Sequence, residues 1–94
     1  MKYFEFNQHE YWALVAAETQ EKAFAVYVSE VGGDSITQII EEGYPTETTK
    51  EFAFGKYIAA VAHLPENQGR GLIGLVNDFL NHKNTTVLIT SELA

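Results

Sequence analysis

Hydrophobic residues recur along the chain with two periodicities, one typical of strands and one typical of helices, and these periodicities predict its secondary structure. Lys2–Phe6 alternates at every second residue, which is typical of a half-buried strand. Tyr11–Ala17 is apolar on both faces and suits a central strand, so the two segments predict a hairpin. Two further β-rich runs, Ser35–Glu42 and Thr85–Ser91, predict two more strands.

Three other segments carry apolar residues at helical spacing. The first follows the N-cap candidate Thr19 and ends before two glycines, and the second opens with Thr48–Glu51, which fits a capping box. The third spans Gly71–His82. The predicted order is β-β-α-β-α-α-β in a single domain, residues 1–94. We therefore expect an α+β fold: a mainly antiparallel sheet of about four strands, with two to three helices packed on one face.

The composition supports one small domain with its own core. The chain has 94 residues, 46% of them hydrophobic, so a modest core can form. The lack of cysteine excludes disulfides and thiolate metal sites. Glu5 and Glu10 come too early for a signal peptide, and no apolar run has the length of a membrane span. We expect a cytoplasmic protein that has no membrane partner.

Motifs that would indicate catalysis or a cofactor lack their context. Residues 69–74 read G-x-G-x-x-G, but a loop rather than a strand is predicted before them. His9, His63 and His82 share no metal-ligand spacing. No serine has a base and an orienting acid that can be named with it. We expect no enzyme, no cofactor and no metal.

The net charge of −7 lies entirely in the first half of the chain. Residues 1–51 carry ten acids against three bases, whereas acids and bases balance in the remainder. Binding to nucleic acid depends on clustered Lys and Arg, and the chain has only six such residues. This distribution argues against direct nucleic-acid binding and favours a protein partner with a basic surface.

Six of the acids flank the ends of neighbouring predicted elements and are candidate partner-binding residues. They are Glu18, Glu21, Glu41, Glu42, Glu47 and Glu51. On one face, they would imitate the phosphates of duplex DNA, which carries one charge per roughly 1.7 Å. The alternative is solubility, for which small domains commonly carry a net charge of about 2–8 in magnitude. Tyr44, in a turn beside Pro45, is a candidate aromatic anchor, and Phe52 lies off its helical stripe.

Two stretches carry a resemblance to known proteins: residues 33–43 (GDSITQIIEEG) and 87–94 (VLITSELA). In these stretches, and in its size and acidity, the chain resembles small accessory proteins of phages and mobile elements in Gram-positive bacteria. Some of these proteins are anti-CRISPR inhibitors that mimic DNA and block the basic channel of an RNA-guided nuclease. The resemblance covers about a fifth of the chain and implies no residue roles. The neutral second half is a departure that would make any mimicry one-sided.

The residues therefore predict a non-enzymatic acidic protein-binding module. Inhibition of a nucleic-acid-handling protein, of the anti-CRISPR or DNA-mimic type, is one form of that function. The alternative is a structural or self-assembling module, a homo-oligomer held by an edge strand or an apolar helix face, in which the acids serve only solubility. Salt distinguishes the two, because it screens charge steering and leaves apolar contacts intact. A small ligand-binding or catalytic domain would need a pocket that no pattern identifies.

Overall fold

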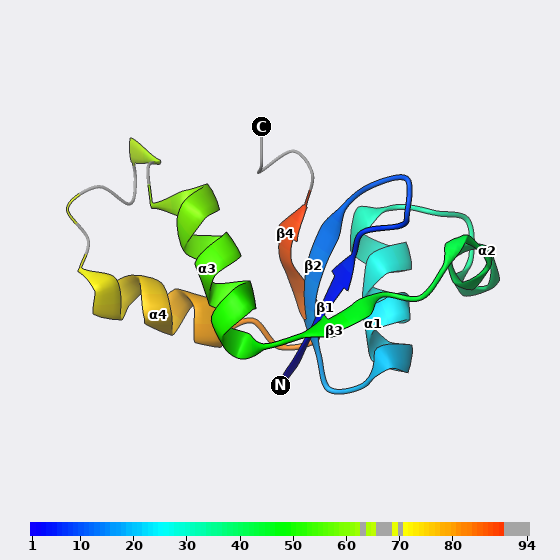
Figure 1. Cartoon of the computed structure of the whole chain (residues 1–94), viewed down its shortest axis with the longest axis horizontal. Helices are drawn as coiled ribbons and strands as arrows, with labels where there is room; N and C mark the ends of the chain where they lie inside the picture. The colour runs from blue at the N-terminus through cyan, green and yellow to red at the C-terminus, as the bar shows by residue number, and fades with distance from the viewer. Residues whose placement is uncertain (63, 66–68, 70, 90–94) are drawn as a thin grey trace.

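In the computed structural model, which describes residues 1–62, 64–65, 69 and 71–89, a four-stranded sheet forms the centre of an elongated molecule (Figure 1). The elements are β1 (Lys2–Phe6), β2 (Ala13–Ala17), α1 (Gln20–Val26), the π-helical turn η1 (Tyr27–Val31), α2 (Ile36–Glu42), β3 (Thr46–Thr48), α3 (Lys50–Val61), α4 (Leu72–Leu80) and β4 (Thr85–Ile89). The strand order is β3-β1-β2-β4, and all neighbours are antiparallel. The predicted α+β class and four-stranded antiparallel sheet are confirmed. Thr90 and Ser91 of the predicted last strand lie outside the described residues.

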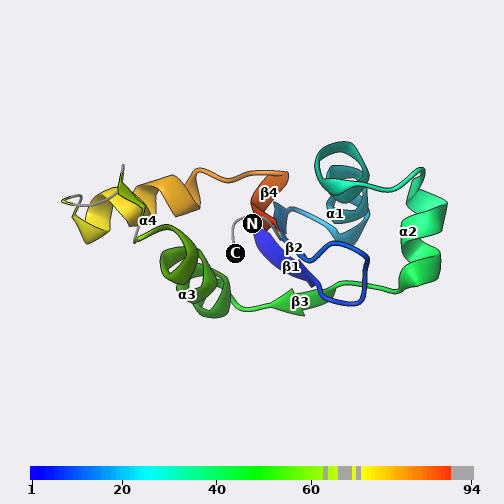
Figure 2. The same ribbon diagram turned by 90° about the horizontal axis from the view of Figure 1, so that it is seen from above.

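The described residues form four α-helices, α1 to α4, rather than the predicted two to three. They lie on both sides of the sheet, so the prediction that they pack on one face was also wrong. Figure 2 shows α1 and α2 on one side of the strands and α3 and α4 on the other. The physical reason lies in β1, where neighbouring residues are both buried: Tyr3 packs towards α3 and α4, whereas Phe4 packs towards α1. The pattern of Lys2–Phe6 emphasises only the Phe4 side.

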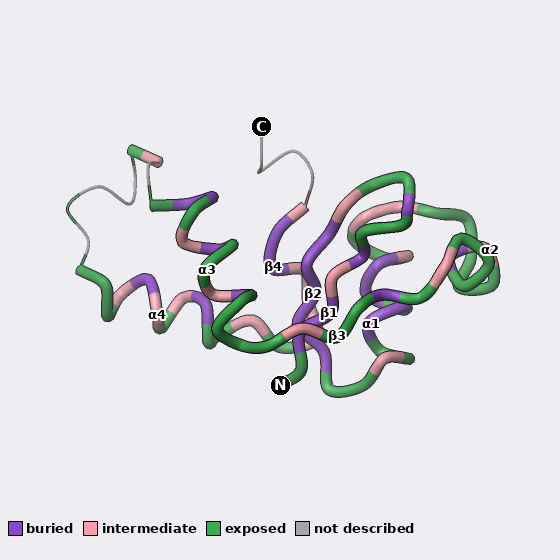
Figure 3. The backbone as a smooth tube through the Cα atoms, viewed as in Figure 1, coloured by how far each residue is buried: buried purple, intermediate pink, exposed green. Residues whose placement is uncertain are grey.

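Each face has its own aromatic core. On one face the ring of Tyr3 stacks on Phe79 of α4 at 5.1 Å between centroids. On the other face the ring of Phe6 stacks on Tyr27 at 4.6 Å. Figure 3 shows burial concentrated along the central strands and the helix sides that face them. Both cores therefore depend on the hairpin of β1 and β2, which has apolar residues on both sides.

The segment Ser35–Glu42 is the helix α2 and not the predicted strand. The Ser35 hydroxyl accepts a hydrogen bond from the backbone N–H of Gln38 at 3.2 Å, which caps the helix. Ile36, Ile39 and Ile40 fall at helical spacing, and Ile39 alone of these is buried. A short apolar run does not separate helix from strand, and here the cap and the single buried side prevailed over the β-propensity of isoleucine. The third strand is instead β3, a three-residue edge strand.

Threonine caps begin two of the helices, α1 and α3. Thr19 accepts from the backbone N–H of Lys22 at 3.1 Å, which confirms the predicted start of α1. For α3 the N-cap is Thr49, which accepts from Phe52 N–H at 3.0 Å, whereas Thr48 ends β3. Glu51 is then one position short of the site that a capping box requires, so the predicted box was wrong by one residue.

The first helix continues directly into η1 before it ends at Gly32. The N–H of Gly32 donates to Tyr27 C=O at 3.0 Å, a bond that spans five residues and is typical of a π-turn. The predicted end before the two glycines is confirmed. This extra turn directs the carboxylate of Glu30 to the first residues of β4.

Candidate functional site

The six predicted acidic residues do not gather on one face. The backbone N–H of Glu18 donates to the side chain of Asn84 at 3.0 Å, and Asn84 directly precedes β4. Glu47, in contrast, lies in the middle of β3. These strands are the two opposite edges of the sheet, three strand spacings or about 14 Å apart. The six carboxylates therefore do not lie along one edge of the sheet, and the set expected from the sequence divides into two groups.

Glu18 has a structural role. Its carboxylate accepts from Asn84 Nδ2 at 2.9 Å and pairs with Lys22 Nζ at 2.9 Å. These bonds, first that from Asn84 and then that from Lys22, lower the pKa of Glu18. Glu21 lies in the first turn of α1, three residues after Glu18. Neither belongs to the surface described next.

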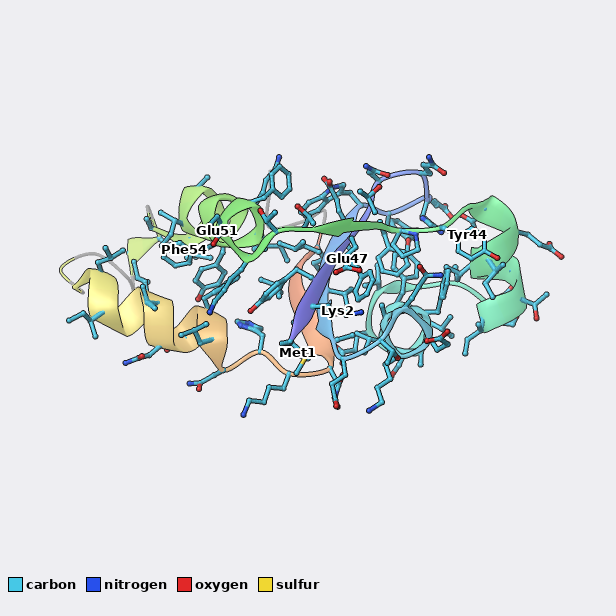
Figure 4. All side chains as sticks on the ribbon, turned by 60° about the horizontal axis from the view of Figure 1, so that its bottom comes forward. Met1, Lys2, Tyr44, Glu47, Glu51 and Phe54 are labelled. Atoms are coloured by element: carbon cyan, nitrogen blue, oxygen red, sulfur yellow. The ribbon has the colours of Figure 1, made fainter. Side chains whose placement is uncertain are left out.

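The other predicted residues follow one continuous course of the chain, from the last turn of α2 through β3 into the first turn of α3 (Figure 1). We call this set the acidic edge: Glu41, Glu42, Tyr44, Glu47 and Glu51. All five side chains are exposed. Figure 4 shows Tyr44, Glu47 and Glu51 in a row along this course. Tyr44 is 58% exposed. Its ring packs against the ring of Phe24 in an edge-to-face arrangement, with 5.8 Å between the ring centroids, so it is held in place and still accessible.

None of the carboxylates of the acidic edge forms an ion pair with a described base. Among the described residues the one ion pair is Lys22–Glu18, at the other edge of the sheet. Glu42 accepts a hydrogen bond from the backbone N–H of Glu10 at 3.3 Å, which ties the hairpin to α2 without adding positive charge. The acidic edge therefore presents four carboxylates without an ion-pair partner among the described residues, beside an exposed aromatic ring.

A second surface, which the sequence pattern did not reveal, lies between α3 and α4. We call it the α3–α4 groove: a hollow of about 300 Å³ lined by Lys50, Glu51, Phe54, Val76, Phe79 and Leu80. Beside it, α4 exposes apolar side chains that were predicted to belong to a core stripe. Leu72 is 63% exposed and Ile73 is 78% exposed. The sequence does contain a signal for this surface, because α4 has more apolar residues than the one side that packs on the sheet can bury.

The exposed aromatic Phe52 of α3 is in contact with a cation of the same helix. Lys56 Nζ lies 5.7 Å from the centre of the Phe52 ring and 6.0 Å from that of Trp12. The Trp12 indole N–H donates to the Glu5 carboxylate at 2.8 Å. A cation over aromatic faces is a self-contained arrangement, so this cluster is not part of the candidate site.

The glycine motif and the histidines of the sequence occupy structural positions, as far as they fall among the described residues. Gly69 and Gly71 follow α3 rather than a strand, and Gly71 precedes α4. His9 is buried, and His82 Nδ1 lies 3.0 Å from Phe79 C=O, whereas His63 and Arg70 lie outside the described residues. Within the described part of the chain, no three His, Asp or Glu side chains cluster as metal ligands would. Nor does that part contain a helix with the length and apolarity of a transmembrane segment.

Comparison with known proteins yields a family. No curated protein and no solved structure matches the chain significantly. The resemblance to phage accessory and anti-CRISPR proteins gains no support from these results and stays a prediction. The family model described as the YosH C-terminal domain matches residues 1–88, a range that contains all helices of the described residues and reaches into β4. On this match, the chain belongs to the YosH C-terminal domain family.

Proposed function

We propose that this chain is a non-enzymatic protein-binding module that holds a partner with a basic surface along the acidic edge. The observation that carries the proposal is the run of carboxylates without ion-pair partners on either side of the exposed Tyr44 ring. Complementary charge steers two proteins together and fixes their register, and a central aromatic side chain supplies much of the affinity. The hairpin core holds β3 in place, so this surface exists before the partner arrives.

One class of partner with such a surface is a protein that handles nucleic acid. Its basic groove would meet carboxylates where it normally meets phosphates, and the module would then act as an inhibitor. Four acids along one edge offer less charge than duplex DNA does, so Tyr44 and neighbouring apolar contacts supply the remainder of the affinity in this proposal.

Charge reversal at Glu47 tests the proposal. Glu47→Lys changes a carboxylate on an edge strand, where lysine is well tolerated. The matched control Glu21→Lys makes the same change in charge in the first turn of α1, outside the acidic edge. We expect Glu47→Lys to lower the association rate for a captured partner about three- to tenfold at low salt, and Glu21→Lys to leave it nearly unchanged.

The measurement begins with a pull-down from nuclease-treated bacterial lysate at low and high salt, with and without duplex DNA as competitor. Capture of a basic protein that high salt displaces supports the proposal, and displacement by DNA identifies a nucleic-acid-handling target. Equal capture by the wild type and Glu47→Lys would overturn it.

Self-assembly is a second candidate function, because α4 exposes apolar side chains. A homo-oligomer formed through this helix would not be displaced by high salt or by Glu47→Lys. Sedimentation of the isolated protein at several concentrations distinguishes this function from the first.

A further inference from the structure

We propose that the α3–α4 groove is a docking site for one amphipathic helix of a partner protein, with basic residues beside its apolar ones. The inference rests on the proposed function and gives that partner a defined element and a second contact surface. It names residues that the acidic edge does not include.

The first step is the amount of apolar surface that no described residue covers. Leu72, Ile73, Val76 and Leu80 follow helical spacing i, i+1, i+4 and i+8, so they form one stripe on α4. Leu72 and Ile73 are 63% and 78% exposed, and Leu80 is 39% exposed. Contiguous exposed apolar side chains of this kind mark interaction sites on small proteins.

The second step is that the stripe borders a hollow of side-chain size. Phe54 of α3 and Val76, Phe79 and Leu80 of α4 line the α3–α4 groove, whose volume is about 300 Å³. Figure 4 shows Phe54 and Glu51 together at its α3 side. A cavity of about 150 Å³ accepts one benzene ring, so there is room for about two apolar side chains of a ligand. Helix-in-groove recognition uses such anchors at i and i+3 or i+4.

The third step separates a partner helix from a second copy of this chain. Each copy carries a net charge of −7, so two copies repel one another. Stable interfaces also use roughly 20–30 residues a side, whereas the nine-residue α4 is about 13 Å long. That length matches two to three turns of a single docked helix.

The fourth step is the charge at the rim. Glu51 lines the groove and is also the last member of the acidic edge, so the two surfaces are continuous. Lys50 borders the same hollow, and its charge offsets that of Glu51 locally. The excess negative charge comes from Glu47 and the residues beyond it. A docked helix therefore carries its lysines or arginines at the end that lies towards β3.

The test uses a synthetic helix of about 14 residues, or four turns, with leucines at i, i+4, i+7 and i+11 and lysines concentrated at one end. Its control is a peptide of the same composition with the leucines spread around the helix. Binding is followed by fluorescence anisotropy at about 0.15 M salt, which reduces purely ionic attraction. We expect the patterned peptide to bind at least about tenfold more tightly than its control.

The informative variant is Ile73→Ser, matched by Ile36→Ser, which changes another exposed isoleucine at the far end of the molecule on α2. Ile73→Ser should weaken binding of the patterned peptide about fivefold or more, and Ile36→Ser should not. Equal binding of the two peptides, or equal binding by wild type and Ile73→Ser, would overturn the inference. A dimer that Ile73→Ser dissociates would also overturn it, because the occupant would then be a second copy.

The two proposals fail in different ways. A lysate partner that Glu47→Lys loses and Ile73→Ser retains would leave the protein-binding function standing and remove the docked helix. Loss of the partner with both variants supports the two surfaces together.

Discussion

At the scale of single residues, Glu30 shows how a carboxylate can serve the fold rather than a partner. Its Oε1 accepts three hydrogen bonds: from Thr86 N–H at 3.0 Å, Thr86 Oγ1 at 2.8 Å and Thr85 Oγ1 at 2.9 Å. Partial burial alone would raise the pKa of Glu30, but these bonds together lower it. The side chain thus satisfies a backbone donor at the start of the edge strand β4, a position that otherwise invites strand pairing.

Glu30→Ala should therefore destabilise the protein in a pH-dependent way. Because the folded-state pKa is depressed, the contribution is complete above the unfolded value near 4.5 and is lost as the pH falls through the folded value. We expect a loss of about 1 kcal/mol at pH 7, at the low end for bonds to a charged group because the carboxylate is partly exposed. Urea denaturation at pH 7 and about pH 3.5 should show the difference from wild type shrinking at the lower pH.

Glu41→Ala is the control for this prediction, since Glu41 is exposed in the last turn of α2 and makes no hydrogen bond among the described residues. It should change stability little at either pH. A Glu30→Ala variant as stable as wild type at pH 7 would mean that water replaces the carboxylate without loss.

At the scale of elements, a buried histidine joins the β1–β2 hairpin to α2. His9 Nε2 lies 3.0 Å from the carbonyl oxygens of both Ile39 and Gly43, so it carries the proton and donates to them. Nδ1 is buried with no hydrogen-bond partner. The His9 ring also packs against Phe6 and Tyr27. Since α2 leads into the acidic edge, this contact helps position the proposed binding surface.

His9→Leu keeps an apolar side chain but removes the donor. Two carbonyl groups then lose a partner, and we expect a loss of about 1–3 kcal/mol in the free energy of unfolding. Faster hydrogen exchange of the α2 amides should accompany the loss, because α2 is the element that the bond fixes. Asn7→Ala, an exposed change in the same turn, serves as the control. Unchanged exchange in α2 would show that apolar packing alone holds this helix.

At the scale of the whole molecule, the protein is elongated and its acidic edge runs along the long direction. The principal extents are 43 × 25 × 19 Å, with α2 at one end and the pair α3 and α4 at the other (Figures 1 and 2). The acidic edge connects these ends, and Glu18 lies across the sheet from it. The two proposed surfaces therefore meet at Glu51, so a partner can contact both without a change in the fold.

The net charge leads to a prediction about salt. With one ion pair among the described residues and a net charge of −7, repulsion between acids outweighs attraction. Raising NaCl to about 0.2 M should screen the repulsion and increase Tm by about 1–3 °C. Glu41→Lys, which makes the net charge less negative, should show a smaller increase. A Tm that falls with salt would indicate that favourable pairs dominate instead.

The sequence by itself determined the fold class, the hairpin, three of the four principal helices and the uneven distribution of charge. These features follow from local periodicity and from side chains such as Thr19 that act on their own backbone neighbours. The acidic candidates and the exposure of Tyr44 could be named in the same way, because turns beside proline lie at the surface.

Only the tertiary structure decided which elements pack together. Residues 35–42 form a helix in which Ile39 is buried against residues of α1. The local sequence pattern does not show that α1 would lie there. Glu18 and Glu47 were separated by the strand order β3-β1-β2-β4, which depends on pairings between distant segments. The groove likewise exists because α4 packs on the sheet through Leu75 and Phe79 and leaves Leu72 and Ile73 exposed. Burial depends on long-range packing, whereas the sequence directly specifies only which residues can be buried.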